Sequence, residues 1–319
     1  MNNYRWQFLF VVACAYLVSL RCTYSCDAFV AGSLDFSDGI GRIPYGLIDY
    51  VGGTVRIGYR MPEFFTLFHD PCALRYRIVK ANRFDEVPVF MYTDSIIKLL
   101  QQDVYKQVPK SAVRIAYSMF EASAIPIEAV EILNNYFDMI VVPDSYYINV
   151  YKNSGVTKPI FCIPIGLYLE HLLAMSVKQE RGSPFTFGCI APDGFEKNLR
   201  KLIDAFYQKY ENDSRFQLVL YTAPEDMFSG QPYLKESLED FIKKLGAKTI
   251  QVIRGEMTTT RYAEFLHSLD CYILLSTGEA FSHTPREALA LGIPCIISNN
   301  TAHTTLCDTG FVVSVACPD

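Results

Sequence analysis

The sequence predicts an α/β protein whose strands form parallel sheets with helices on both faces, built as two similar halves. From residue 27 onward, short β-branched or aromatic runs alternate with segments of helical periodicity. This order is typical of parallel sheets, because the helices that join successive strands cover the sheet. The alternation starts again after a polar stretch, SVKQERGSP at 176–184. With 319 residues, 50% of them hydrophobic, the chain is long enough for two cores.

The first half contains a series of strand-like runs. They are DAFVAGSL (27–34), TVRIGY (54–59), VPVFMY (88–93), VRIAYS (113–118), DMIVVP (138–143) and PIFCIP (159–164). A helical pattern covers 127–135, and Pro126 is placed to open that helix.

The second half repeats the same order. Its strand-like runs are FTFGCI (185–190), FQLVLY (216–221), TIQVIR (249–254), CYILLS (271–276), PCIIS (294–298) and FVVSV (311–315). Helical patterns at 196–210, 234–245 and 259–269 separate the first four runs. We therefore expect two Rossmann-like domains, 27–175 and 183–319, with a cleft between them and ligands outside the carboxyl ends of the strands.

Residues 1–26 form a signal-like or membrane-anchor segment. An uncharged run from Trp6 to Leu20 lies between Arg5 and Arg21. Its fifteen residues are fewer than the roughly 20 that a membrane span needs, and they suit the apolar core of a secretory signal. A buried first strand is the alternative. The location stays open between a cytosolic domain, a membrane-associated domain that faces the cytosol, and secretion.

Charge and cysteine usage exclude several classes of function. A net charge of −5 argues against an electrostatic nucleic-acid binder. Among the ten cysteines, Cys162, Cys271 and Cys295 lie inside apolar runs, where a reduced cysteine is a small buried hydrophobe. There is no CxxC and no histidine pair at metal-ligand spacing, so we expect no metal site and no bound cofactor.

The segment STGEAFSHTPREALALGIP, 276–294, predicts a strand, a loop and a helix. Thr284 suits the N-cap, Pro285 the first helical position, and Glu287 completes a capping box. Gly292 is placed to end the helix.

This helix start suits an anion. Backbone amides near His283 and Thr284, together with the helix dipole, favour a diphosphate. Glu279 can accept hydrogen bonds from sugar hydroxyls, and Glu287 from a ribose. The alternatives are a solvated loop carboxylate for Glu279 and a purely capping role for Glu287.

The stretch GEAFSHTPREALALGIPCIISNN resembles the Glu-x7-Glu signature of retaining family-4 glycosyltransferases, which have the GT-B fold. The residues that match the family pattern are Glu279, Phe281, Pro285, Glu287, Ala288, Ala290, Gly292 and Pro294. The resemblance implies that Glu279 contacts a donor hexose and that Glu287 binds the ribose. It also implies that the backbone amides of Phe281, Ser282, His283 and Thr284 hold the sugar and the diphosphate. Ala280 and Ser282 replace two glycines of the family.

The stretch FTFGCIAPDGFEKNLRKLIDAF, 185–206, is similar to the first strand and helix of the family's donor domain. Lys197 matches the lysine that neutralises the donor phosphates, a role that needs a fixed positive charge. Cys189 follows Gly188 where the family commonly has an arginine. The alternative for Lys197 is a solvated helix residue.

Two further segments extend the resemblance. Residues 118–167 are similar to the end of the family's acceptor domain, and Glu121 is a possible acceptor or sugar contact. Its alternative is a carboxylate at a helix start. In the loop at 31–46, Gly39 and Gly41 leave room for the donor diphosphate, or form a plain turn.

The resemblance implies a retaining, metal-independent glycosyltransferase that moves a hexose from a nucleoside-diphosphate sugar to a hydroxyl acceptor. His283 is a weaker candidate for assisting the leaving phosphate, and His303 shows no usable pattern. Two alternatives stay open: a catalytically reduced protein that binds nucleotide sugars or glycans, and, more distantly, a nicotinamide-dependent oxidoreductase. Family members usually continue with crossover helices after the last strand, FVVSV, and the expected fold lacks them.

Overall fold

The computed structural model describes residues 28–32, 57–60, 78–80, 88–101, 104–108, 110, 112–167, 169–175, 184–222, 236–255 and 258–317. The chain divides into two compact units, residues 1–166 and 167–319. The expected signal or anchor at 1–26, the two glycines Gly39 and Gly41, and the linker residues 176–183 all lie outside the described residues. Within the described part, no helix combines the length and the hydropathy needed to cross a membrane.

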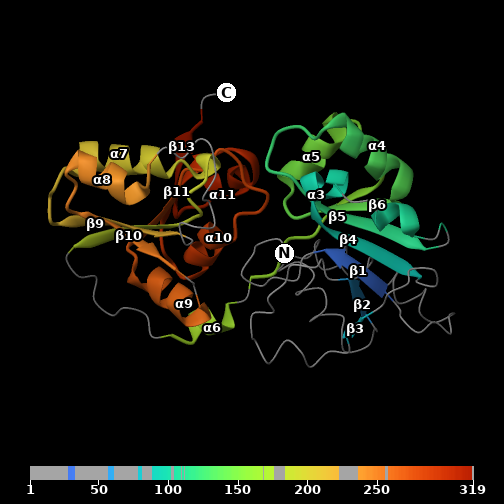
Figure 1. Cartoon of the computed structure of the whole chain (residues 1–319), viewed down its shortest axis with the longest axis horizontal. Helices are drawn as coiled ribbons and strands as arrows, with labels where there is room; N and C mark the ends of the chain where they lie inside the picture. Colours follow the sequence, from blue (N-terminus) through green and yellow to red (C-terminus); the bar gives the residue numbers. More distant parts are fainter. Residues whose placement is uncertain are drawn as a thin grey trace. The chain divides into compact units, whose positions relative to one another are not determined.

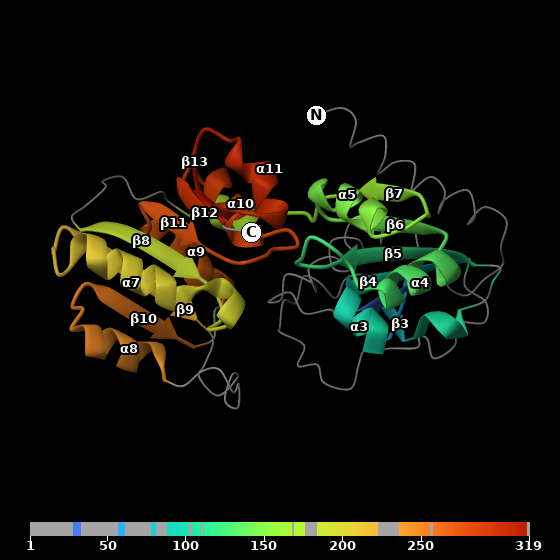
Figure 2. The ribbon, with the colours of Figure 1, turned by 90° about the horizontal axis from the view of Figure 1, so that it is seen from above.

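The first unit is built on a parallel sheet of seven strands in the order β3-β2-β1-β4-β5-β6-β7. The strands are β1 (Ala28–Gly32), β2 (Ile57–Arg60), β3 (Ile78–Lys80), β4 (Val89–Ser95), β5 (Val113–Met119), β6 (Met139–Val142) and β7 (Ile160–Cys162). The helices among the described residues of this unit are α3 (Ile96–Gln101), the 3₁₀ helix η2 (Val104–Gln107), α4 (Ile127–Tyr136) and α5 (Tyr146–Asn153). Helices α4 and α5 lie over the same face of the sheet (Figures 1 and 2). Pro126 directly precedes α4, as predicted.

The second unit has a parallel sheet of six strands in the order β10-β9-β8-β11-β12-β13. The strands are β8 (Phe185–Ile190), β9 (Phe216–Thr222), β10 (Ile250–Arg254), β11 (Cys271–Leu274), β12 (Cys295–Asn299) and β13 (Val312–Ala316). The helical elements that the described part of this unit contains are α6 (Glu170–Leu173), η3 (Phe195–Lys197), α7 (Leu199–Tyr210), α8 (Leu238–Leu245), α9 (Thr259–Ser268), α10 (His283–Ala290), η5 (Thr301–His303) and α11 (Thr304–Cys307). Helices α7 and α8 lie on one face of the sheet and α9 on the other (Figure 1). The predicted α/β fold with two parallel sheets is confirmed.

Helix α7 shows how sequence periodicity builds the second core. Its buried residues are Leu199, Leu202, Ile203 and Phe206, at the i, i+3, i+4 and i+7 spacing of one helix face. Phe206 packs edge-on against Phe187 of β8, with ring centroids 5.9 Å apart. The helix is therefore fixed to the strand that precedes the loop carrying Lys197.

Side-chain caps set the limits of two other helices. Ser237 accepts a hydrogen bond from the amide of Asp240 at 3.1 Å and opens α8, which ends at Gly246 with a left-handed φ of 68°. Thr258 caps α9 in the same way through the amide of Arg261.

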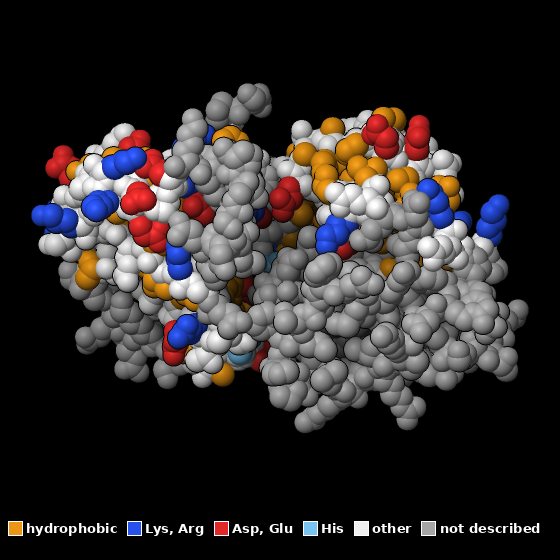
Figure 3. All heavy atoms as spheres, viewed as in Figure 1, with side chains coloured by type: hydrophobic (Ala, Val, Ile, Leu, Met, Phe, Trp, Pro, Cys, Tyr) orange, Lys and Arg blue, Asp and Glu red, His pale blue; other side chains and the backbone are white. Residues whose placement is uncertain are grey.

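The surface of the second unit carries charges of both signs. Over α7 and α8, basic and acidic side chains lie side by side (Figure 3). Arg215 pairs with Asp213, and Lys244 with Glu236. Mixed charge of this kind keeps a surface soluble without creating a field of one sign.

The cysteines of the described residues are free thiols. Cys162, Cys271 and Cys295 are buried, as predicted from their apolar surroundings. Burial raises the pKa of the Cys295 thiol to about 12, so it stays protonated at neutral pH.

Candidate functional site

The candidate site lies where the strand order of the second sheet reverses. Strands β8 and β11 are neighbours in the sheet, but the chain runs from β8 outward to β9 and β10 before it returns to β11. The loops that leave the carboxyl ends of such a pair diverge and leave room for a ligand. Here those loops are 191–198 and 275–282, which carry Lys197 and Glu279.

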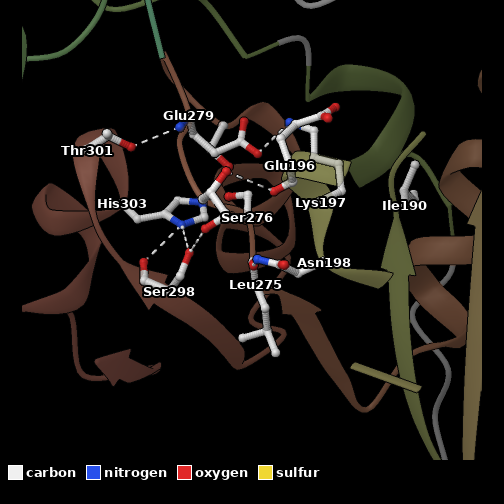
Figure 4. A network of polar contacts seen from close by, with 12 residues as sticks. Ile190, Glu196, Lys197, Asn198, Leu275, Ser276, Glu279, Ser298, Thr301 and His303 are labelled. Atoms are coloured by element: carbon white, nitrogen blue, oxygen red, sulfur yellow. Dashed lines mark hydrogen bonds and ion pairs between the residues drawn. The ribbon is translucent and has the colours of Figure 1, made fainter. Parts of the chain in front are cut away.

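Lys197 and Glu279 form an ion pair at this position (Figure 4). The Nζ atom of Lys197 lies 2.8 Å from Oε1 of Glu279, and the two side chains are only 13% and 10% exposed. Neither side chain is therefore the solvated residue that the sequence allowed as an alternative. A largely buried pair attracts strongly but also loses much hydration.

Lys197 is set apart from the basic residues that follow it. Arg200 is held by Asp193, with Nη1 and Oδ1 2.7 Å apart, and it also donates to the carbonyl oxygen of Glu236. Lys201 is exposed. Of these three cations, only Lys197 makes its ion pair with the Glu279 loop.

The two loops are joined by further hydrogen bonds. The amide of Thr277 donates to the carbonyl oxygen of Glu196 at 2.8 Å. The side-chain amide of Asn198 donates to the carbonyl oxygen of Leu275, also at 2.8 Å (Figure 4). These bonds fix the backbones on both sides of the ion pair, so Lys197 and Glu279 are positioned before any ligand arrives.

The backbone of Glu279 is held from the opposite side by η5. Its amide donates to Oγ1 of Thr301 at 2.8 Å, and its carbonyl oxygen accepts from the amide of Ala302 at 3.3 Å. Thr301 has a left-handed φ of 43°, which is unusual for a β-branched residue. This strained residue at the site is a feature typical of functional positions.

Ser282 and His303 form a buried polar pair beside Glu279. Oγ of Ser282 lies 2.8 Å from Nε2 of His303, whose side chain is fully buried. Nδ1 of His303 lies 3.1 Å from the carbonyl oxygen of Ser298, an atom that can only accept. We assign the neutral tautomer with the proton on Nδ1, so that Nε2 accepts from the Ser282 hydroxyl. Burial lowers the pKa of His303, which agrees with a neutral ring.

Helix α10 begins at His283, and Ser282 occupies its N-cap position. The predicted capping box is wrong, because Thr284 lies inside the helix and Pro285 is its third residue. The Ser282 side chain makes no capping bond to α10, since its hydroxyl bonds His303 instead.

Glu287 lies one helical turn into α10 and is 1% exposed. Its Oε2 atom accepts a hydrogen bond from the hydroxyl of Tyr262, on α9. The Glu287 carboxylate is thus held by a side chain of another helix.

The remaining predicted residues lie either around the start of α10 or in the first unit. Phe281 is buried, and the guanidinium of Arg286 lies over its ring at 4.2 Å. His283 packs edge-on against the same ring, and Thr284 is half-buried. Glu121 follows β5 in the first unit and is exposed.

Sequence reasoning missed Thr301, His303, Ser298 and Tyr262. Three of them belong to the run SNNTAH at 298–303, at the carboxyl end of β12. A cluster of polar residues directly after a buried strand is the signal that points to them, because β12 is the neighbour of β11 in the sheet. Among the described residues, no group of three or more His, Cys, Asp or Glu side chains is arranged to hold a metal ion.

Most of the second unit matches the model of a known protein family. Residues 175–311 match the model of the family described as glycosyl transferases group 1. A search of curated protein sequences finds no match.

The fold is that of GT-B glycosyltransferases of known structure. The structure of Anabaena Alr3699/HepE in complex with UDP and glucose aligns with a TM-score of 0.67 at 13% identity, over 90% of this chain and 85% of that one. The α,α-trehalose 6-phosphate synthase of Burkholderia multivorans aligns with a TM-score of 0.61 at 11% identity, over 90% and 86% of the two chains. The pneumococcal O-GlcNAc transferase GtfA, in complex with UDP and GlcNAc, aligns with a TM-score of 0.55 at 17% identity, over 73% of this chain and 47% of GtfA.

Proposed function

We propose that the protein is a retaining, metal-independent glycosyltransferase that moves a hexose from a nucleoside-diphosphate sugar to a hydroxyl acceptor. The observation that carries the proposal is the Lys197–Glu279 pair at the strand reversal of the second sheet. The family match over residues 175–311 supports a transferase of this kind. Two of the similar structures hold UDP together with a sugar, which supports a nucleotide-sugar donor.

Lys197 is assigned to the donor diphosphate. Negative charge develops on the leaving diphosphate as the glycosidic bond breaks, and a fixed ammonium group stabilises that charge. The arriving diphosphate competes with Glu279 for Lys197, so the ion pair opens or is shared when the donor binds. Backbone amides at the start of α10, at His283 and Thr284, add the helix dipole to the same task.

Glu279 and Glu287 are assigned to the two sugars of the donor. Glu279, once it shares Lys197 with the diphosphate, accepts hydrogen bonds from hydroxyls of the transferred hexose. Glu287 accepts from the ribose of the nucleotide. A carboxylate has several acceptor positions, so Glu287 can hold the Tyr262 hydroxyl and a ribose hydroxyl together.

Retention of the anomeric configuration is proposed through the leaving phosphate. The phosphate oxygen that departs from the anomeric carbon takes the proton of the acceptor hydroxyl, and the acceptor oxygen bonds to the same face of the sugar. Proton NMR of the fresh product decides this point. An inverted anomer excludes the retaining mechanism.

Metal independence is proposed because the ammonium group of Lys197 supplies the positive charge that a divalent cation supplies in other transferases. Turnover in the presence of EDTA is the test. Loss of activity that returns on addition of Mg²⁺ or Mn²⁺ contradicts this part of the proposal.

The donor is identified by a panel of UDP-, GDP- and ADP-sugars. A ligand that binds the folded chain raises its melting temperature, so thermal shifts select the nucleotide and calorimetry then measures its affinity. We expect one nucleotide to bind in competition with its sugar conjugate. No shift with any member of the panel contradicts the proposal.

A second candidate is a catalytically reduced protein that binds nucleotide sugars. It is favoured by Ser282, whose φ of 62° is the conformation that glycine adopts most readily, and by the buried Ala280 beside Glu279. Tight nucleotide binding without transfer or donor hydrolysis supports this candidate. Turnover of a donor sugar excludes it.

A further inference from the structure

Ser282 occupies a backbone conformation that a serine adopts at a cost. Its φ of 62° and ψ of 74° lie in the left-handed region, where a side chain crowds the backbone and glycine does not. Its hydroxyl could offset this strain by capping α10, but it makes no such bond. The hydroxyl instead donates to Nε2 of His303 at 2.8 Å.

The other ring nitrogen of His303 bonds the carboxyl end of β12. Its Nδ1 donates to the carbonyl oxygen of Ser298, the fourth residue of β12, at 3.1 Å. Oγ of Ser298 donates in turn to the carbonyl oxygen of Ser276 at 2.6 Å, just after β11 (Figure 4). A continuous chain of hydrogen bonds therefore runs from Ser276 to Ser282, the two ends of the loop that carries Glu279.

The centre of the same loop is held by Thr301, which accepts from the amide of Glu279 at 2.8 Å. Three residues of one short segment, Ser298, Thr301 and His303, thus fix the loop at both ends and in the middle. The bonds that involve Ser276, Glu279 and Ser282 each use a side chain of this segment, in addition to the backbone hydrogen bonds of Thr277 and Glu279.

We infer that His303 is a positioning residue of the donor site, which acts through Ser282 to set the loop at 276–282 and the first amides of α10. This inference rests on the proposed function for its ligand. His303 is needed because position 282 is a serine: with glycine there, the left-handed conformation carries no strain and needs no partner. The two positions are therefore energetically coupled, as residues that share a hydrogen bond in a buried network generally are.

The test is a double-mutant cycle with four proteins: wild type, Ser282→Gly, His303→Leu and the double variant. UDP serves as the probe, and calorimetry measures its dissociation constant. We expect His303→Leu to weaken UDP binding by about tenfold in the wild-type background, and by less than about threefold in the Ser282→Gly background. His303→Gln keeps an amide oxygen where Nε2 accepts, so it is expected to weaken binding much less than His303→Leu.

Hydrogen exchange of the backbone amides in 276–286 provides a readout without ligand. His303→Leu is expected to speed exchange in this segment, and Ser282→Gly to reverse most of that increase. If His303→Leu does not fold but the double variant does, this rescue supports the coupling between the two positions. If neither variant folds, the coupling is contradicted.

Equal losses from His303→Leu in both backgrounds, in affinity and in exchange, overturn the inference, because His303 is then only a core residue. If wild type binds no UDP, GDP or ADP, the proposed function fails instead, and the exchange cycle still decides the role of His303.

Discussion

Lys197 and Glu279 stand 82 positions apart in the chain, and their charged atoms lie 2.8 Å from each other at the carboxyl edge of one sheet. The contact arises from topology, because each residue sits on the loop after one of the two strands that flank the reversal of strand order. The site is thus defined by two loops of the second unit and by the polar segment that follows β12.

Lys197→Met is expected to remove most nucleotide affinity. The change deletes the ammonium group while it keeps a long apolar stem, so the diphosphate loses its charged partner and turnover falls by about 100-fold or more. Calorimetry with UDP and a transfer assay measure the two effects. Lys201→Met is the matched control, because Lys201 is exposed on α7, the helix that directly follows η3. Equal losses in both variants contradict the assignment.

Glu279→Gln is expected to separate sugar chemistry from nucleotide binding. The amide no longer competes for Lys197 as a carboxylate does, so UDP affinity is kept or rises while transfer falls by about 100-fold. The largely buried Lys197 loses its counter-charge, and the free energy of unfolding falls by about 2 kcal/mol. Urea unfolding, UDP calorimetry and the transfer assay test these effects. A parallel loss of UDP binding contradicts the separate roles.

Tyr262→Phe tests how Glu287 is held. The variant removes the hydroxyl that donates to the buried carboxylate, and we expect the free energy of unfolding to fall by about 1–3 kcal/mol. Nucleotide affinity falls as well, because the ribose contact loses its orientation. The KM for the donor and urea unfolding report on these two quantities. Unchanged values for both mean that the hydrogen bond does not position Glu287.

The neutral state of His303 predicts a dependence of stability on pH. Burial, the largest cause, lowers its pKa below the ordinary value of 6.5, and Lys197 and Arg286 act in the same direction against the opposing carboxylate of Glu279. Below pH 6.5 the unfolded chain takes up a proton that folded His303 does not accept until lower pH. The free energy of unfolding therefore decreases as the pH is lowered below about 6.5, by up to about 1.4 kcal/mol for each pH unit.

Urea unfolding of wild type and His303→Gln between pH 7.5 and 5 checks this dependence, with the pH range chosen around the ordinary value of 6.5. The difference between the two proteins isolates His303, since groups such as Asp138, whose pKa is lowered, titrate in both. Parallel curves for the two proteins rule out a neutral His303 in the folded state.

The sequence predicted the parallel strands well because they are buried on both faces and read as continuous apolar runs. Strand β8 has the predicted limits. The helix predicted at 127–135 is one residue longer in the structure and ends at Tyr136. The strand β3 was missed, since only three residues form it amid charged neighbours. Helix α5, YYINVYKN, was also missed. Its aromatic and β-branched residues have low helix propensity, and the burial of Tyr147 and Tyr151 one turn apart stabilises it instead.

The local part of the site was within reach of sequence reasoning, and the long-range part was not. The order of strand, loop and helix at 276–294 was predicted, whereas the capping box expected from Thr284 and Glu287 is not formed. The local pattern also carries no information about Tyr262, 25 positions before Glu287. The same holds for His303, which contacts Ser282 across 21 positions. Contacts of this kind depend on the order of β11 and β12 in the sheet, and a single local motif does not encode that order.

The most direct test of the proposed donor site is a crystal structure of the protein with UDP bound. We expect a diphosphate oxygen within hydrogen-bond distance of Nζ of Lys197, beside the first amides of α10, with the ribose at Glu287. A nucleotide bound elsewhere, with the Lys197–Glu279 pair intact and out of contact with phosphate, contradicts the proposed site.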